Sequence, residues 1–333
     1  MSFEIPTKDW SHSVSTVTLG ATPDDGGTRT STVTIGGSTT LPFLDFEGET
    51  GQPAMAMEVL DVEPDGWPKP LVEPFGDVLG DPADWAAKCV EDFGADLICL
   101  KLESAEPTRQ DASPDECAET VRSILAAVGV PLIIWGCGDY DKDNEVMPVC
   151  SQAAAGERCL LGSAEEDNYR TIAAAALADG HLVIGEAPLD ISIQKQVNIL
   201  LSEQGVPDDR IVMYQVTGAV GYGVEYAYSI LERTRIAALG GDRMLGMPML
   251  SIVGSEAWKT KEAWMTEAEN PEWGPIERRG IIWEVATAEL FLLSGTDMLI
   301  FWHPEAMDQT RWLVEEMSSN PAGNVVEAAV ASE

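Results

Sequence analysis

Two patterns of apolar residues divide the chain near residue 50. Before that point, two short segments of alternating threonine and valine, STVTLG and STVTIGG, flank a turn-rich stretch that contains Asp-Asp-Gly-Gly. Alternation on both sides of such a turn predicts a β-hairpin. We therefore expect residues 1–50 to form an N-terminal hairpin cap.

From residue 54 onward, short apolar runs alternate with longer helical patterns. The eight runs span residues 54–60, 95–102, 130–136, 158–163, 181–187, 210–216, 247–253 and 297–302. They are almost continuously apolar, as is typical of parallel strands that are buried on both faces.

The segments between these runs carry helix start and stop signals. Ser113, Pro114 and Glu116 form the pattern of a capping box, and Gly129 closes that helix. The same scheme predicts a helix from Ser163 to Gly180, with Glu166 completing the box, and another from Asp190 to Gly205.

Eight strand-then-helix units fit a closed (β/α)8 TIM barrel better than an open sheet, since no dinucleotide-binding GxGxxG follows the first strand. We expect this α/β barrel to span residues 51–317. The remaining residues, 318–333, have the composition of a polar C-terminal tail.

Composition narrows the class of protein. The chain has 333 residues, of which 45% are hydrophobic, and 56 acidic residues against 20 basic ones give a net charge of −36. Such a charge repels nucleic acids and anionic membranes, which excludes both as partners. We interpret it as an acidic solvated surface, of the kind that suits a salty cytoplasm.

The sequence also favours a cytoplasmic protein. No apolar run approaches the roughly 20 residues of a membrane-spanning helix, and the first residues lack the pattern of a secretory signal. The six cysteines are far apart, without CxxC pairs, so they predict free thiols rather than disulfides or a zinc site.

Polar residues follow most of the predicted strands, on the face where TIM barrels place their sites. They are Asp61, Glu103, Cys137 with Asp139, Ser163 with Asn168, Asp190, Thr217 with Gly218, Glu256, and His303. Several have a plainer interpretation: Ser163 and Asp190 as helix caps, and His303 as a partner of nearby backbone.

Cys137 lies between two glycines, Gly136 and Gly138. A nucleophilic cysteine needs a neighbouring histidine, and among His12, His181 and His303 only the last is on the predicted site face. We therefore interpret Cys137 as a packing residue rather than a nucleophile or metal ligand.

The strongest local signal is the loop TGAVGYG after the sixth strand of the predicted barrel. Its glycines, Gly218, Gly221 and Gly223, would let the backbone approach a ligand closely beside Tyr222. The alternative is a strained turn that needs positive φ. The next loop is long and carries Trp258, Trp264 and Trp273, which suggests a lid or a protein interface.

Several phrases together resemble one family. GATPDDGGTRTSTVTIGG, LPFLDFEGE, WAAKCVEDFGADLICLKL, VGVPLIIWGCGDYDKDNEV, GYGVEYAYSILERTRIAAL and SEAWKTKEA, between residues 14 and 315, are similar to the small subunit of the corrinoid iron–sulfur protein, the delta subunit of the acetyl-CoA decarbonylase/synthase system.

The resemblance implies a TIM barrel that pairs with a larger subunit carrying a [4Fe-4S] cluster and the corrinoid. The heterodimer would accept a methyl group from a methyltetrahydropterin methyltransferase and deliver it to acetyl-CoA synthase in the Wood–Ljungdahl pathway of an anaerobe. The barrel mouth would cover the corrinoid, and this chain would have no catalytic residue, metal ligand or iron–sulfur cluster of its own.

On this resemblance, the candidate corrinoid-contacting residues are Cys137, Gly138, Asp139, Ser163, Asn168, Asp190, Thr217, Gly218, Gly221, Tyr222, Gly223, Glu256 and His303. Residues 179–185, DGHLVIG, approach a cobalt-ligating motif but have Ile184 where glycine is required. We expect no histidine of this chain to bind cobalt.

Two enzyme alternatives remain open. A pterin-dependent methyltransferase of the related barrel family could use Asp139, Asn168, Asp190 and Asn198 to hold a pterin. A Schiff-base aldolase could use Lys101, although no neighbouring residue in the sequence favours a lowered pKa there.

Overall fold

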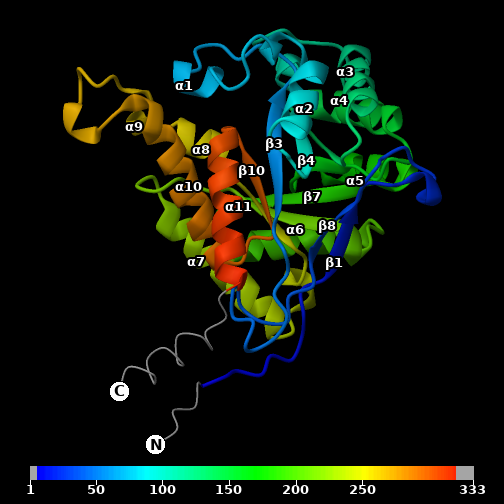
Figure 1. Cartoon of the computed structure of the whole chain (residues 1–333). Coiled ribbons are helices and arrows are strands. Elements are labelled where there is room, and N and C mark those ends of the chain that lie inside the picture. Colours follow the sequence, from blue (N-terminus) through cyan, green and yellow to red (C-terminus); the bar gives the residue numbers. More distant parts are fainter. Residues whose placement is uncertain (1–5, 320–333) are drawn as a thin grey trace, which may run out of the picture.

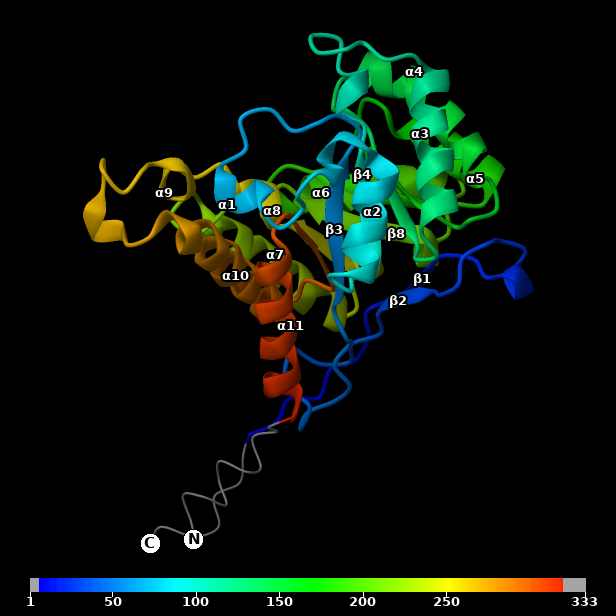
Figure 2. The same ribbon diagram turned by 45° about the horizontal axis from the view of Figure 1, so that its top comes forward.

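The computed structural model describes residues 6–319, and these form a closed barrel of eight parallel strands with helices around it (Figures 1 and 2). The strand order is β10-β3-β4-β5-β6-β7-β8-β9, so consecutive strands are neighbours and the last pairs with the first. The strands are β3 (Ala54–Leu60), β4 (Leu97–Lys101), β5 (Leu132–Trp135), β6 (Leu160–Ala164), β7 (Leu182–Ala187), β8 (Ile211–Gln215), β9 (Met249–Ile252) and β10 (Met298–Phe301). All eight predicted strands and the predicted barrel are confirmed.

A helix follows each barrel strand and covers its outer face. These helices are α2 (Pro82–Glu91), α3 (Pro114–Ala127), α4 (Tyr140–Ala153), α5 (Tyr169–Asp179), α6 (Ile191–Glu203), α7 (Val224–Leu239), α10 (Ile276–Ser294) and α11 (Pro304–Ser319). The loops add short helices α1 (Lys69–Val72), α8 (Gly254–Trp258) and α9 (Lys261–Trp264), which lie at the top of the view in Figure 1. The predicted C-terminal tail lies outside the described residues from residue 320 onward.

The helix caps follow the sequence signals in two cases. Ser113 and Glu116 form the predicted capping box of α3: the Ser113 amide donates to the Glu116 carboxylate at 2.8 Å. Asp190 caps α6 by accepting from the Ser192 and Ile193 amides at 2.7 and 3.1 Å. These local patterns sufficed because each cap satisfies amides of its own first turn.

The predicted start of α5 at Ser163 is wrong. Ser163 belongs to β6, and the helix begins only at Tyr169. Between them, the Asn168 side chain accepts from the Glu165 amide at 2.7 Å and donates to the Ser163 carbonyl at 3.0 Å. This turn extends the connection, so Ser163 and Glu166 do not cap the helix.

The N-terminal hairpin fills one end of the barrel. Its strands β1 (Thr16–Leu19) and β2 (Val33–Gly36) pair antiparallel, as predicted. Val17, Leu19 and Ile35 are fully buried in one apolar cluster with inward-facing barrel residues such as Leu97. Since barrel interiors are packed cores, the hairpin closes the end that lies opposite the strands' carboxyl ends.

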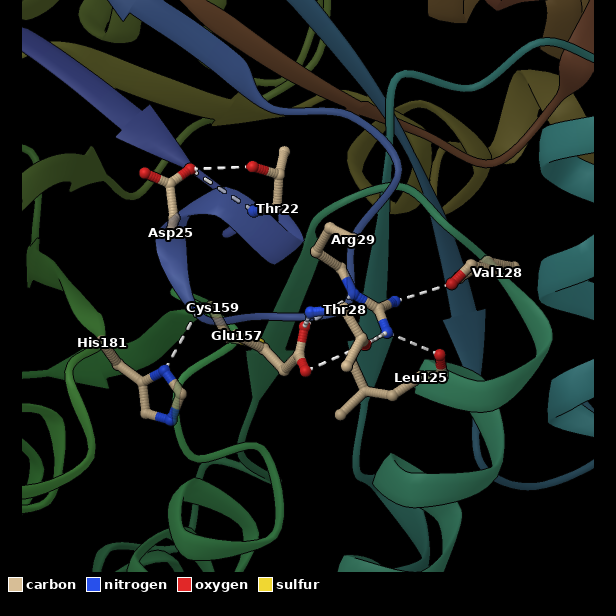
Figure 3. A network of polar contacts seen from close by, with 9 residues as sticks. All are labelled: Thr22, Asp25, Thr28, Arg29, Leu125, Val128, Glu157, Cys159 and His181. Carbon is tan, nitrogen blue, oxygen red and sulfur yellow. Dashed lines mark hydrogen bonds and ion pairs between the residues drawn. The ribbon is translucent and has the colours of Figure 1, made fainter.

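An arginine in the hairpin turn fixes this cap to the barrel (Figure 3). Arg29 is only 2% exposed, and its Nε donates to Glu157 at 2.9 Å. Its two terminal nitrogens donate to the carbonyls of Leu125 and Val128 at 2.6 Å each, at the C-terminal end of α3. A guanidinium there satisfies carbonyls that lack helical partners and opposes the negative end of the helix dipole.

We predict that Arg29→Met lowers the free energy of unfolding by about 3 kcal/mol, because it leaves Glu157 without its buried cation. Urea denaturation of wild type and variant measures the difference. Arg122→Met is the matched control, since Arg122 forms an exposed ion pair with Glu119 at 2.9 Å that should contribute little. Equal losses in the two variants would contradict the role assigned to Arg29.

Candidate functional site

A cavity of about 490 Å³ opens at the carboxyl ends of the barrel strands. This is the end where TIM barrels place their sites, and the volume is in the range of small-molecule pockets. Its lining comes from β3 to β9, from the loops that follow them and from the residue that follows β10. The residues are Glu58, Leu60, Pro64, Asp65, Trp67, Lys101, Glu103, Arg109, Trp135, Gly138, Ser163, Glu165, Glu186, Tyr214, Ile252, Ser255, Glu256, Lys259 and Trp302.

Three predicted site residues line this cavity. Gly138, Ser163 and Glu256 follow or end three different strands, and the fold brings them to one opening. Glu256 also pairs with Lys259 at 2.9 Å on the cavity rim. The strand-end rule therefore located the cavity correctly, although it identified only part of the lining.

Cys137 packs beneath the rim and does not line the cavity. Its amide and that of Gly138 donate to the two oxygens of the buried Asp143 carboxylate at 2.8 and 2.9 Å, and its thiol donates to the same residue at 3.2 Å. Burial, with a smaller contribution from Asp143, raises the pKa of Cys137 to about 12. The group is a protonated thiol at neutral pH, as a packing residue would be.

Four further predicted residues hold loops in place. Asp139 caps α4 by accepting from the Lys142 amide at 2.9 Å, and Asp190 caps α6. Asn168 braces the β6–α5 turn as described above. Thr217 is buried and donates to the Ile252 carbonyl at 3.2 Å, which ties the end of β8 to β9. Their polar groups are engaged by nearby backbone, beside the cavity rather than in its lining.

The glycine loop lies beside the cavity too. Gly221 and Gly223 have φ of +77° and +101°, which favours the interpretation as a turn that requires glycine. Trp283 supports this turn by donating to the Val220 carbonyl at 2.9 Å. A side chain at Gly218 would clash, since its Cβ would lie 2.5 Å from the Tyr222 carbonyl oxygen. Tyr222 itself is 47% exposed, so the loop presents an aromatic side chain to the surroundings.

His303 is buried against α10 and the seventh loop. Its Nδ1 accepts from the Glu305 amide at 3.1 Å, and its ring stacks on Trp258 with centroids 5.8 Å apart. Burial lowers the pKa of His303 to about 4, so the ring is neutral at physiological pH. Of the two interpretations from sequence, the geometry supports the partner of nearby backbone.

Glu284 is a buried acid that sequence reasoning missed. Its carboxylate accepts from the Trp258 indole and the Trp302 amide at 2.7 Å each, and from the His303 amide at 3.3 Å. Burial raises its pKa to about 7, against the opposing effect of these three donors. It lies in the middle of α10, whereas the strand-end rule considers only residues that follow strands. Its hydrogen bonds hold the segment that carries Trp302 in position.

Trp302 forms one wall of the cavity. Its indole donates to Glu58 at 2.6 Å, and its ring packs on Trp67 with centroids 4.6 Å apart. Glu284 therefore acts on the cavity indirectly, by setting the position of this wall.

The cavity floor consists of residues that the sequence reasoning did not select as a site. Glu58, Lys101, Trp135, Glu186 and Tyr214 continue the inward-facing alternation of their strands, as in Leu97, Cys99, Lys101. Of these, only Lys101 was considered, as the Schiff-base lysine of an aldolase. The signal was available: at the last inward position, the apolar alternation changes to charged and aromatic residues.

Within residues 6–319, no group of three or more His, Cys, Asp or Glu side chains could hold a metal ion. No helix in the same range has the length and apolar character needed to cross a bilayer.

Comparison with known proteins gives one consistent family. A family model described as CO dehydrogenase/acetyl-CoA synthase delta subunit matches residues 16–309. The delta subunit of the acetyl-CoA decarbonylase/synthase complex from Archaeoglobus fulgidus is 39% identical over 98% of this chain and 73% of that protein. The corresponding subunit from Methanosarcina mazei is 40% identical over 90% of this chain and 69% of that protein.

Solved structures show the same barrel in proteins of distant sequence. Dihydropteroate synthase from Coxiella burnetii, in complex with pteroic acid, has a TM-score of 0.55 and 16% identity, and the match covers 84% of this chain and 98% of that one. The enzyme from Xanthomonas albilineans in complex with 7,8-dihydropteroate has a TM-score of 0.56 and 15% identity, with 85% and 100% covered. At this identity the likeness concerns the fold alone.

We predict that Glu284 makes stability depend on pH. Its folded-state pKa of about 7 lies above the ordinary 4.5, so its favourable contribution is complete below about pH 4.5 and is lost as the pH rises through 7. Between about pH 5 and pH 8, wild type should lose more unfolding free energy than Glu284→Gln does, by an amount on the order of 3 kcal/mol.

Urea denaturation of both proteins at the two pH values measures this difference. Glu119→Gln is the control, because Glu119 is an exposed acid on α3 and should preserve the wild-type pH dependence. Parallel pH profiles for wild type and Glu284→Gln would show that Glu284 is ionised throughout.

Proposed function

The chain belongs to the CO dehydrogenase/acetyl-CoA synthase delta subunit family, and we propose that its barrel mouth covers a corrinoid held by a larger partner subunit. The single observation that carries this proposal is the cavity at the strand ends, open to the outside and lined by aromatic and hydrogen-bonding side chains. Such a surface suits a large, partly polar cofactor.

The size of the cavity favours a chain that covers the corrinoid over one that encloses it. At about 490 Å³ it holds a drug-sized molecule, whereas a corrin ring with its side chains is larger. The ring would rest on the rim formed by residues such as Gly138, Ser163 and Glu256, and one of its arms would enter. Cobalt, when bound in the partner, supplies the site that carries the methyl group.

The residues of the mouth fit a supporting subunit. Within the described chain, none of the three histidines lines the cavity, and Cys137 is a protonated thiol outside it. The side chains here would orient the corrinoid and shield it from water rather than form a covalent bond. On this proposal, the partner subunit carries the [4Fe-4S] cluster, and the pair accepts a methyl group from a methyltetrahydropterin methyltransferase and passes it to acetyl-CoA synthase.

The alternative, a pterin-dependent methyltransferase, has less support. Asp139 and Asp190 cap helices, and Asn168 braces a turn. Asn198 is buried and donates to the Met244 carbonyl at 2.7 Å. None of these four residues is in the cavity lining, so they do not converge on one ligand.

The test compares binding to the partner subunit with and without its corrinoid. Ser255→Trp places a large side chain in the mouth, and Ser31→Trp places the same one in the separate cavity at the hairpin end of the barrel. We predict that wild type and Ser31→Trp bind the loaded partner at least tenfold more tightly than the empty partner. Ser255→Trp should lose this preference because its indole occupies the space of the corrinoid.

Isothermal titration calorimetry gives the six affinities, for three proteins with loaded and with empty partner, and thermal unfolding confirms that both variants fold. A wild-type chain that binds loaded and empty partner equally would overturn the proposal. So would a Ser255→Trp variant that retains the full preference.

A further inference from the structure

The floor of the mouth cavity has its own donor and acceptor pattern. Lys101 ends β4, Glu58 lies on the adjacent β3, and Glu186 lies on β7 across the barrel. In the register of β3 and β4, Lys101 pairs with Leu60. Glu58 precedes Leu60 by two residues, so it is the next inward-facing residue toward the barrel interior. All three residues line the cavity together with the rings of Trp135 and Tyr214.

Lys101 differs from the other cations of the lining. Arg109 pairs with Glu103 at 2.6 Å, and Lys259 pairs with Glu256 at 2.9 Å. In the part of the chain that the structure describes, the Lys101 ammonium group forms neither an ion pair nor a hydrogen bond. Its Nζ lies over the ring of Trp135, 5.6 Å from the ring centroid. The ammonium group therefore has donors available to a ligand.

Neither of the two carboxyl groups forms an ion pair with Lys101, although both are affected by its charge. Burial raises the pKa of both, to about 7 for Glu186, and the field of Lys101 opposes this rise at both residues. Glu58 already accepts from the Trp302 indole at 2.6 Å. Glu186, which is hydrogen-bonded to Ser163, lines the same cavity as Lys101, and a ligand group in that cavity would contact both.

The aromatic residues shape this space. The rings of Trp135 and Tyr214 meet edge to face, with centroids 5.1 Å apart and planes at 85°. Tyr214 is only 5% exposed. They give the floor an apolar wall against which a flat group can pack.

We propose that this floor binds a carboxamide-type group, whose carbonyl oxygen accepts from Lys101 and whose N–H donates to Glu186. A simple anion would face two carboxyl groups, and a simple cation would face the ammonium. An apolar group would leave the Lys101 ammonium desolvated without a partner and would further desolvate both carboxyl groups. An amide presents both an acceptor and a donor on one planar edge, so it matches the pattern.

This inference rests on the proposed function, because the corrinoid ring carries acetamide and propionamide arms and one of them would reach the floor. The same amide edge occurs in free heterocycles, such as the amino-oxopyrimidine ring of a pterin. The shared chemistry is the planar edge with one carbonyl and one N–H, and the two sources are distinguished by the probes below.

The first experiment tests the corrinoid as the source of the amide and uses the heterodimer. The partner subunit is loaded either with cobinamide, which keeps its carboxamides, or with heptamethyl cobyrinate, in which methyl esters replace them and no N–H remains. Wild type should bind the cobinamide-loaded partner at least tenfold more tightly than the ester-loaded one. Lys101→Met and Glu186→Leu should each lose most of this preference, since hydrogen bonds to charged groups are strong.

Lys88→Met is the matched control: it removes a lysine from α2, outside the cavity lining, where it pairs with Asp92 at 3.2 Å. It should keep the wild-type preference. Thermal unfolding of each variant shows that the barrel is intact.

The second experiment tests a free heterocycle as the source, and it titrates the chain alone with 6-methylpterin. Binding that is lost in Lys101→Met and Glu186→Leu but kept in Lys88→Met supports the floor site with a free heterocycle as its source. This experiment does not need the partner subunit, so it tests ligand binding at the cavity floor even if the corrinoid proposal fails.

The inference is overturned if wild type does not distinguish the two corrinoids and also does not bind 6-methylpterin. It is equally overturned if Lys101→Met and Glu186→Leu behave as wild type with every probe. In the first case, a retained preference for loaded over empty partner would leave the proposed function standing without this floor site.

Discussion

Closure of eight parallel strands into a barrel is the constraint on which the rest of this structure depends. Closure sends alternate side chains of every strand inward, where they must fill a space of fixed width. Along β4, Leu97 and Cys99 are buried in this interior, and Lys101 comes next at the open end. The change from apolar to charged side chains thus follows from position along the strand, and it creates the candidate site.

The two ends of the barrel differ: one is closed by the hairpin and the other is open. At one end the hairpin covers the interior with Val17, Leu19 and Ile35, and Arg29 satisfies the carbonyls at the end of α3. At the other end, the interior is left open and polar. Burial there raises the pKa of carboxyl groups such as Glu186 and Glu284, because a low-dielectric surrounding disfavours their charged forms.

The family is that of a subunit in a multi-subunit complex. Most polar groups predicted for the site, including Asp139, Asn168 and Asp190, are used to hold the loops in position. This leaves a rigid rim around a cavity whose floor carries the unpaired donor of Lys101. A rigid, preorganised surface is what covering a bound cofactor requires, since little conformational entropy is then lost on contact.

The sequence by itself determined the eight strands, the hairpin, the caps of α3 and α6, and the family, because each depends on residues close together in the chain or on runs of similar residues. It also located the end of the barrel that carries the cavity. Only the tertiary structure decided which residues meet there: Glu58 and Glu186 lie on strands far apart in sequence, and Glu284 reaches Trp302 from the middle of a helix. The loop from β6 to α5 failed as a local prediction because Asn168 bonds back to the strand. Neighbours in sequence determine secondary structure and caps, whereas the members of a cavity are set by barrel closure and by the side chains that closure turns inward.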